Sequence, residues 1–152
     1  MDSAMTLSQG ARAALTFQTY EPQPPIDGVF VHRLKVFRGL EGDFMELCRL
    51  REGQIEGLPQ GFEPRQFSLS KAVPGRLNAF HLHPKRPQHE LWCVLEGQLR
   101  VWLVDLRQGS ATEGNRRQVI LSGEEPAFLF VPWGVAHGYQ AGARGAMLLY
   151  AS

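Results

Sequence analysis

Cysteine is scarce in this chain: Cys48 and Cys93 are the two present, and no Cys-x-x-Cys spacing occurs. A chain of this length needs no disulfide to fold. Thiols inside apolar runs are typical of buried, reduced cysteines in a cytoplasmic protein. Charge of one sign is also lacking, because 16 basic and 15 acidic residues leave a formal net charge of +1. That balance argues against nucleic acid or a membrane surface as a partner.

Long apolar runs are missing as well. No stretch approaches the roughly 20 apolar residues of a membrane span. Residues 1–20 lack the basic lead and apolar core of a secretory signal, so we expect neither a membrane segment nor secretion. The 152 residues are 43% hydrophobic and 20% charged, which predicts one ordinary globular domain.

Glycine and proline, by contrast, are abundant, and their 16 and 10 residues separate short runs of β-forming residues. No segment keeps a helical period for three turns. The most regular turn is Glu96-Gly97, which we expect to join two strands as a two-residue hairpin. We therefore predict an all-β fold with an N-terminal arm over residues 1–27 and a domain over residues 28–152. Its expected strands are 29–37, 44–50, 65–73, 76–83, 90–95, 98–106, 118–121, 127–131 and 146–150.

Two histidines, His81 and His83, lie two residues apart on a predicted strand, so their side chains project from the same face. Leu77 and Ala79 continue that face backward. Small and apolar residues in these places are what an inward-facing wall requires.

Glu90 opens the next predicted strand, and His137 begins a later one. Three imidazoles and one carboxylate from separate strands can meet inside a barrel and bind one divalent metal ion. The candidate ligands are therefore His81, His83, Glu90 and His137. In the alternative interpretation these histidines line a polar cavity, and Glu90 pairs with a base such as Arg65 or Arg86.

The spacing of these residues resembles the two cupin motifs. Gly75, His81-Leu82-His83, Glu90 and Gly97 resemble the first motif, and residues 132–137 resemble the second, Pro-x-Gly-x-x-His. The resemblance implies a single cupin-type double-stranded β-helix, or jelly roll. It also implies an enzyme, isomerase or dioxygenase, that uses one divalent ion of Fe, Mn, Ni, Co or Zn.

A second resemblance covers most of the chain after Gly28. It is to the dTDP-4-dehydrorhamnose 3,5-epimerases and related dTDP-sugar isomerases, which are themselves dimeric cupins. The segments that carry it are 42–46, 66–70, 75–81, 104–112, 131–139 and 148–150. The Val-Asp-Leu-Arg run at residue 104 and the Pro-x-Gly-x-Ala-His-Gly run at residue 132 are specific signatures as a pair.

The resemblance implies that the chain is an epimerase or isomerase of a nucleotide-linked, dTDP-type 4-keto sugar. His81 would remove the proton next to the ketone, and Tyr150 would return one from the opposite side. No cofactor is then expected, and the protein would be a homodimer. Substrate-binding residues would be Gln66, Ser68, Asn78 and His137.

Two departures from that family keep other functions open. Asn78 stands where the family has a phosphate-binding Arg, and Glu90 stands where it has an enolate-stabilising Lys. Because His83 also replaces a Gln, the departures restore the cupin metal set. A metal would act as a Lewis acid, but His81 cannot be both its ligand and the base. A non-catalytic sugar-binding cupin is the third hypothesis.

Overall fold

The computed structural model describes residues 6–16, 22–58 and 61–152, and its regular structure consists of eleven strands and one short helix in those residues. The all-β prediction is confirmed. The elements are α1 (Gln9–Ala14), β1 (Phe30–Arg33), β2 (Val36–Gly39), β3 (Gly42–Met45), β4 (Leu50–Arg51), β5 (Gln54–Ile55), β6 (Phe67–Ala72), β7 (Leu77–His81), β8 (Glu90–Asp105), β9 (Arg116–Ser122), β10 (Ala127–Val131) and β11 (Val135–Ala151).

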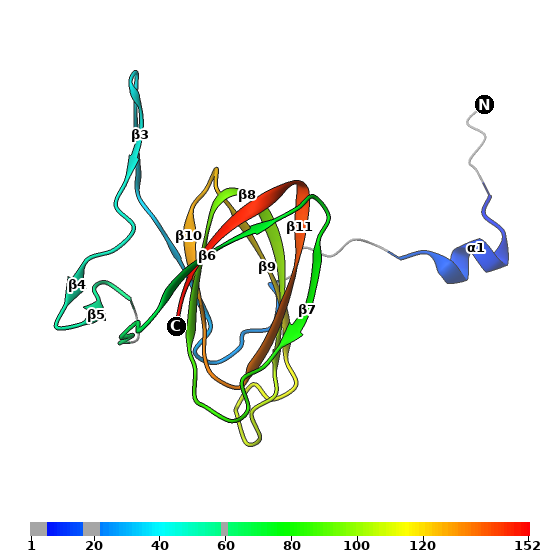
Figure 1. The fold of residues 1–152 in the computed structure, drawn as a ribbon. Coiled ribbons are helices and arrows are strands. Elements are labelled where there is room, and N and C mark those ends of the chain that lie inside the picture. Colours follow the sequence, from blue (N-terminus) through cyan, green and yellow to red (C-terminus); the bar gives the residue numbers. More distant parts are fainter. Residues whose placement is uncertain (1–5, 17–21, 59–60) are drawn as a thin grey trace.

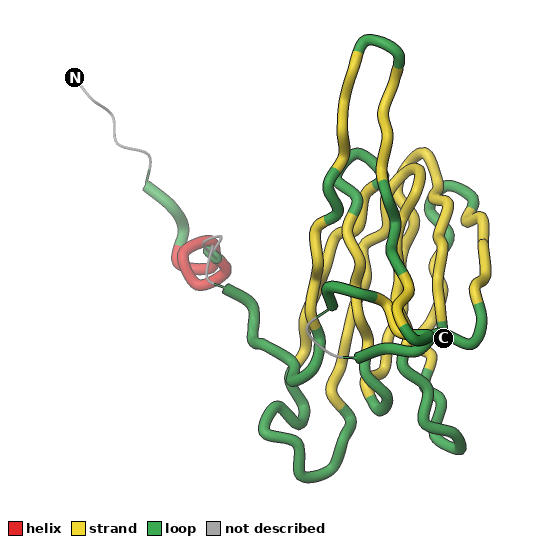
Figure 2. Tube along the Cα trace, turned by 90° about the vertical axis from the view of Figure 1, so that its left-hand side faces the viewer, coloured by secondary structure: helices red, strands yellow, loops and turns green. Residues whose placement is uncertain are grey.

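The predicted N-terminal arm contains α1, which lies apart from the strands in both views (Figures 1 and 2). Ser8 caps this helix by accepting the amide hydrogen of Ala11, and no residue of α1 is buried. The last arm residues behave differently. Ile26 is 2% exposed, and the carbonyl of Pro25 accepts from Asn115 Nδ2 at 2.8 Å. Within the described residues, no helix is long and apolar enough to span a membrane.

The body is built around β8 and β11, which pair antiparallel along most of their length. The first half of β8 pairs with β10, which in turn pairs with β1, and the second half of β11 pairs with β6. The other two halves pair with β9 and β7. The two long strands therefore pass from one side of the barrel to the other, as Figure 1 shows. This arrangement is a cupin-type jelly roll.

The hairpin predicted at Glu96-Gly97 is wrong, because β8 runs through these residues without reversing. Gly97 has φ 71° and lies opposite Ala146 in β11, at a shift of register. A Cβ at Gly97 would overlap the carbonyl oxygen of Gly145. Glycine is needed here so that two bending strands can cross closely. The same residue type that favours a turn thus serves a bend in a continuous strand.

Two small hairpins interrupt the predicted strands 29–37 and 44–50. The β2–β3 hairpin projects from the body in both views (Figures 1 and 2), and the cross-strand pair Phe37 and Phe44 leaves both rings exposed. The β4–β5 hairpin follows it. On the outer side of the barrel, Phe130 of β10 stacks on Phe30 of β1 with ring centroids 4.9 Å apart. An apolar layer therefore covers the outer side of β10, and its inner side faces the barrel.

The segment 104–112 that carried part of the family resemblance forms a buried polar network. The fully buried Asp105 accepts hydrogen bonds from Arg107 Nε at 2.8 Å, Ser110 Oγ at 2.8 Å and Thr112 Oγ1 at 2.6 Å. The Arg107 guanidinium is the main reason that the pKa of Asp105 lies well below its ordinary value. Arg107 also donates to the carbonyl of Asp27 at 2.7 Å. The network thus fixes the β8–β9 loop to the end of the arm.

Candidate active site

Strands β7 and β11 bring His81 and His137 together. The two residues are opposite each other in the antiparallel register, so their side chains share a face of the sheet. Their ring centroids are 6.3 Å apart with an interplanar angle of 25°. His137 is 4% exposed, whereas His81 is exposed. The pair therefore extends from the core of the barrel to its surface.

Glu90, the first residue of β8, lies at the centre of the polar cluster and is 6% exposed. His83 Nε2 lies 3.0 Å from its Oε1, and His137 Nε2 lies 3.5 Å from its Oε2. Trp92 Nε1 donates to Oε2 at 2.7 Å, and Gln88 Nε2 donates to Oε1 at 3.3 Å. The expected convergence of imidazoles and a carboxylate is therefore present in the structure.

Both ring nitrogens of His137 face oxygen atoms of the protein. Nδ1 lies 3.1 Å from the carbonyl oxygen of Val135, and Nε2 faces Glu90. Burial lowers the pKa of His137 from its ordinary value, and the Glu90 carboxylate acts in the opposite direction. A ligand inside the barrel would consequently meet the His137 ring rather than a free nitrogen.

The four expected metal ligands do not form a metal site in this geometry. Ligands must direct their lone pairs at one point about 2 Å from each donor atom. Here the Nε2 atoms of His83 and His137 face oxygens of Glu90, which also accept from Trp92. In residues 6–16, 22–58 and 61–152, no group of three or more His, Cys, Asp or Glu could hold a metal ion. In the geometry described, His81, His83, Glu90 and His137 are therefore not arranged as a metal site.

In the alternative interpretation Glu90 pairs with a base such as Arg65 or Arg86, and the bases found beside it are His83 and His137. Arg65 forms its ion pair with Glu63, at 2.9 Å. Glu90 is instead satisfied by uncharged N–H donors and imidazoles.

The inward wall predicted at Leu77 and Ala79 is wrong. The register between β7 and β11 shifts after His137, so that Tyr139 lies opposite Asn78. Leu77 is consequently 69% exposed, and Ala79 is also exposed. An irregularity in the ladder changes which residues face inward. As a result Asn78, half-buried beside a Tyr139 that is 4% exposed, faces the same way as His81.

Tyr150, Ser68 and Gln66 lie in the other half of the barrel. Tyr150 is opposite Ser68 in β6 and opposite Trp92 in β8, so the three side chains share one face. Gln66 Nε2 donates to Ser68 Oγ at 2.8 Å. The Trp92 ring packs edge-on against His137 with centroids 5.1 Å apart. Trp92 thus connects the Tyr150 group to the histidine pair.

The hydrogen bond from Trp92 to Glu90 was not predicted from the sequence. The signal was present, because residues two apart in a strand share a face and Glu90 precedes Trp92 by two. Trp133 was missed as well. Its indole Nε1 donates to the His83 carbonyl at 2.8 Å, and its backbone N–H donates to His89 Nδ1 at 3.1 Å. No sequence pattern predicts these contacts between distant segments.

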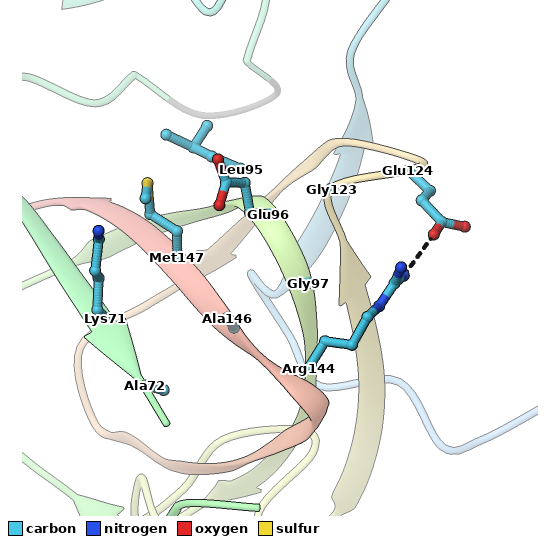
Figure 3. A pocket seen from close by; sticks show the side chains of 10 residues that line it. All are labelled: Lys71, Ala72, Leu95, Glu96, Gly97, Gly123, Glu124, Arg144, Ala146 and Met147. Carbon is cyan, nitrogen blue, oxygen red and sulfur yellow. Dashed lines mark hydrogen bonds and ion pairs between the residues drawn. The ribbon is translucent and has the colours of Figure 1, made fainter. Parts of the chain in front are cut away.

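A cavity of about 520 Å³ lies at the bend of β8 (Figure 3). Lys71, Glu96 and Met147 line it, and Arg144 pairs with Glu124 at its edge, at 2.8 Å. None of the predicted site residues contributes to this cavity.

The jelly roll with histidines, a carboxylate and a tyrosine on its inner face defines a cupin-type protein. The family model described as dTDP-4-dehydrorhamnose 3,5-epimerase matches residues 23–152. The chain therefore belongs to the dTDP-4-dehydrorhamnose 3,5-epimerase family, which confirms the resemblance found in the sequence.

Individual relatives agree with this assignment. The spore coat polysaccharide biosynthesis protein SpsL of Bacillus subtilis (strain 168) is 39% identical over 115 residues, which are 76% of this chain and 71% of that protein. The dTDP-4-dehydrorhamnose 3,5-epimerase of Methanothermobacter thermautotrophicus is 34% identical over 116 residues, which are 76% of this chain and 62% of that protein. The match therefore spans less than two thirds of the second relative.

Solved structures are similar in fold. The dTDP-4-dehydrorhamnose 3,5-epimerase from Bacillus anthracis, with TDP and PPi bound, has a TM-score of 0.72 and 25% identity over 82% of this chain and 71% of that chain. The dTDP-6-deoxy-D-glucose-3,5-epimerase of Legionella pneumophila, in complex with dTDP-4-keto-L-rhamnose, has a TM-score of 0.70 and 27% identity over 85% of this chain and 68% of that chain.

Replacing Gly138 with Ala should push β7 away from β11. A Cβ at this position would lie 2.9 Å from the Asn78 carbonyl oxygen. We expect the free energy of unfolding to fall by about 1–3 kcal/mol, measured by urea denaturation. Gly39→Ala is the control, because its Cβ would meet nothing closer than 3.8 Å. Equal losses in the two variants would contradict the close approach of β7.

Proposed function

We propose that this chain is an epimerase of a dTDP-linked 4-keto sugar that works by proton transfer next to the ketone. Membership of the epimerase family supports the reaction and the substrate class. The observation that carries the proposal is the position of His81, opposite His137 on the inner face and still accessible from outside. A catalytic base must lie on the inner face and also be accessible from outside, so that a sugar can bind next to it.

His81 is proposed as the base. Imidazole changes its charge near neutral pH, so it can take a proton from carbon and later release it. His137 is fixed by Val135 and Glu90, and it is proposed to contact the substrate through its ring. His81 differs from His137 in that it is exposed. The base is thus free to approach a ligand.

Tyr150 is proposed as the acid, and neutral donors are proposed to stabilise the ketone oxygen. Because Gln66 donates to Ser68 Oγ, the hydroxyl hydrogen of Ser68 remains available for another acceptor. The amide of Asn78 is a second neutral donor on the inner face. Hydrogen bonds of this kind stabilise the negative charge that develops on an enolate oxygen.

This reaction needs no cofactor, because His81 and Tyr150 carry the protons themselves. We also propose the cytoplasm as the location of the protein. The observation in support is that Cys48 and Cys93 are both free thiols.

Replacing His81 with Asn should abolish exchange of the substrate's carbon-bound protons. In deuterium oxide, with a dTDP-4-keto-6-deoxyhexose, we expect the rate of deuterium incorporation to fall at least about 100-fold. NMR of the recovered sugar measures it. His32→Asn, on the exposed face of β1, is the matched control and should keep the rate of the unmodified chain.

Unchanged exchange in His81→Asn would overturn the assignment of the base. Binding of the nucleotide sugar without exchange in the unmodified chain would instead identify a sugar-binding cupin.

Replacing Tyr150 with Phe should separate the two half-reactions. His81 would still remove and return a proton on its own side, so deuterium would enter the sugar. Inversion of configuration needs a proton from the other side, so the yield of epimer should fall about 100-fold or more. NMR of the product reports both quantities in one sample. Equal loss of exchange and of inversion would contradict the division of roles.

We further infer a homodimer in which the β2–β3 hairpin contributes to the interface. Phe37 is 51% exposed, Phe44 65%, and Leu40 is fully exposed at the tip. Large apolar side chains grouped on a projecting element are typical of protein interfaces. The hairpin projects from its own barrel, to which Arg38 joins it by donating to the Glu124 carbonyl at 3.0 Å (Figure 1). A second copy is the occupant that symmetry favours for its exposed apolar side chains.

Replacing Phe37 and Phe44 with Ser should shift the mass in solution from two chains to one. Light scattering after size exclusion measures this mass. Leu106→Ser is the control, because Leu106 is 55% exposed but lies outside the hairpin. A monomeric unmodified chain, or a double variant that remains dimeric, would contradict the proposed interface.

A further inference from the structure

The connection between β7 and β8 carries two adjacent basic residues, Lys85 and Arg86. Both are exposed, and neither forms an ion pair with another described residue. Pro84 and Pro87 flank the pair, and proline restricts the backbone on both sides. The two cations are therefore presented on a short loop with limited freedom.

Both ends of this loop are tied to the same carboxylate. His83, before the basic pair, has Nε2 3.0 Å from Glu90 Oε1, and Gln88, after it, donates to the same oxygen at 3.3 Å. Trp133 adds two further contacts, to the His83 carbonyl and to His89 Nδ1. The loop is thus ordered without any ligand, which reduces the entropy lost on binding.

The loop lies within reach of the reaction. Lys85 follows His81 by four residues, so its backbone is at most about 13 Å away. In a nucleotide-linked hexose the diphosphate is attached to the ring that reacts. It must therefore lie within about one sugar ring of the base.

None of the proposed substrate contacts on the inner face carries a fixed positive charge for that diphosphate. These contacts are neutral or titratable: Gln66, Ser68, Asn78, His81, His137 and Tyr150. Arginine and lysine form the strong charge-assisted bonds that phosphate oxygens favour. Lys85 and Arg86 are the basic residues nearest in sequence to His81 on its C-terminal side.

We propose that Lys85 and Arg86 bind the diphosphate of the nucleotide sugar, and that Glu90 is the positioning residue that holds their loop. This proposal rests on the function proposed above. It assigns a phosphate-binding loop to the segment between β7 and β8. It also gives Glu90 a role that requires neither a metal nor contact with the reacting carbon.

Replacing both Lys85 and Arg86 with Gln should weaken binding of dTDP about 10- to 100-fold. Isothermal titration of the full chain measures this affinity, and thymidine serves as the probe without phosphate. Thymidine binding should not change. In turnover, KM should rise and kcat should fall as well, because the ketone is held less well in line with His81 even though the base and the acid are intact.

The double variant Lys71→Gln/Arg100→Gln is the matched control, since it removes two exposed positive charges elsewhere on the barrel. It should bind dTDP as the unmodified chain does. Equal affinity for dTDP in both double variants would overturn the proposed phosphate loop. If the unmodified chain binds no dTDP, the proposed function and this inference fall together.

Two variants of Glu90 test the positioning role. Glu90→Gln keeps an oxygen that can accept from His83 or Gln88 and should retain most of the dTDP affinity. Glu90→Leu removes both oxygens, so dTDP binding should weaken about 10-fold while thymidine binding is kept. Adding Glu90→Leu to the Lys85 and Arg86 variant should cause little further loss. A full additional loss would overturn the link between Glu90 and the loop.

Discussion

The burial of one carboxylate, Glu90, determines how the polar interior of this barrel is arranged. A carboxylate that is 6% exposed would cost several kcal/mol without donors around it. Its partners come from three parts of the chain: Trp92 within β8, His83 and Gln88 in the preceding loop, and His137 on β11. Satisfying this single group therefore fixes the position of each part. His81 depends on it indirectly, because β7 is held in register with β11 at His137.

The two long strands divide the proposed site into halves. In one half β11 presents His137 to β7, and in the other it presents Tyr150 to Ser68 and Trp92. A base and an acid that act on opposite sides of a sugar need such a separation. Gly97 contributes at a distance, since the bend of β8 requires a residue without Cβ where Gly145 approaches. The absence of a side chain at Gly97 thus helps to determine where β11 presents His137 and Tyr150.

Sequence patterns predicted the all-β architecture and the convergence of histidines with Glu90, but not the contacts that these side chains form. Strand alternation and motif spacing were enough to bring His83, Glu90 and His137 into one cluster. The same alternation gave the wrong side for Leu77, because a shift in the β7–β11 register changes which residues of β7 face inward. No residue type in the sequence predicts that shift. The turn signal at Gly97 failed because a hairpin and a bent strand both use positive φ. Residue identity also does not specify where an imidazole nitrogen points, so the arrangement of His81, His83, Glu90 and His137 around a metal could not be predicted from the sequence alone.

The interior of the barrel carries the negative charge of Glu90, and the proposed phosphate loop carries the positive charges of Lys85 and Arg86. This distribution of charge has a consequence for catalysis. Glu90 is surrounded by donors and cannot supply the positive charge that would stabilise an enolate. Under the proposed mechanism, neutral donors such as Ser68 and Asn78 take that part, and neutral hydrogen bonds are weaker than charge-assisted ones. The rate must then depend more on holding the ketone in line with His81. A diphosphate held by Lys85 and Arg86 would provide that orientation, because it fixes the sugar at the ring carbon that bears the phosphate. Binding energy at the loop would thus compensate for the weaker electrostatics of the interior.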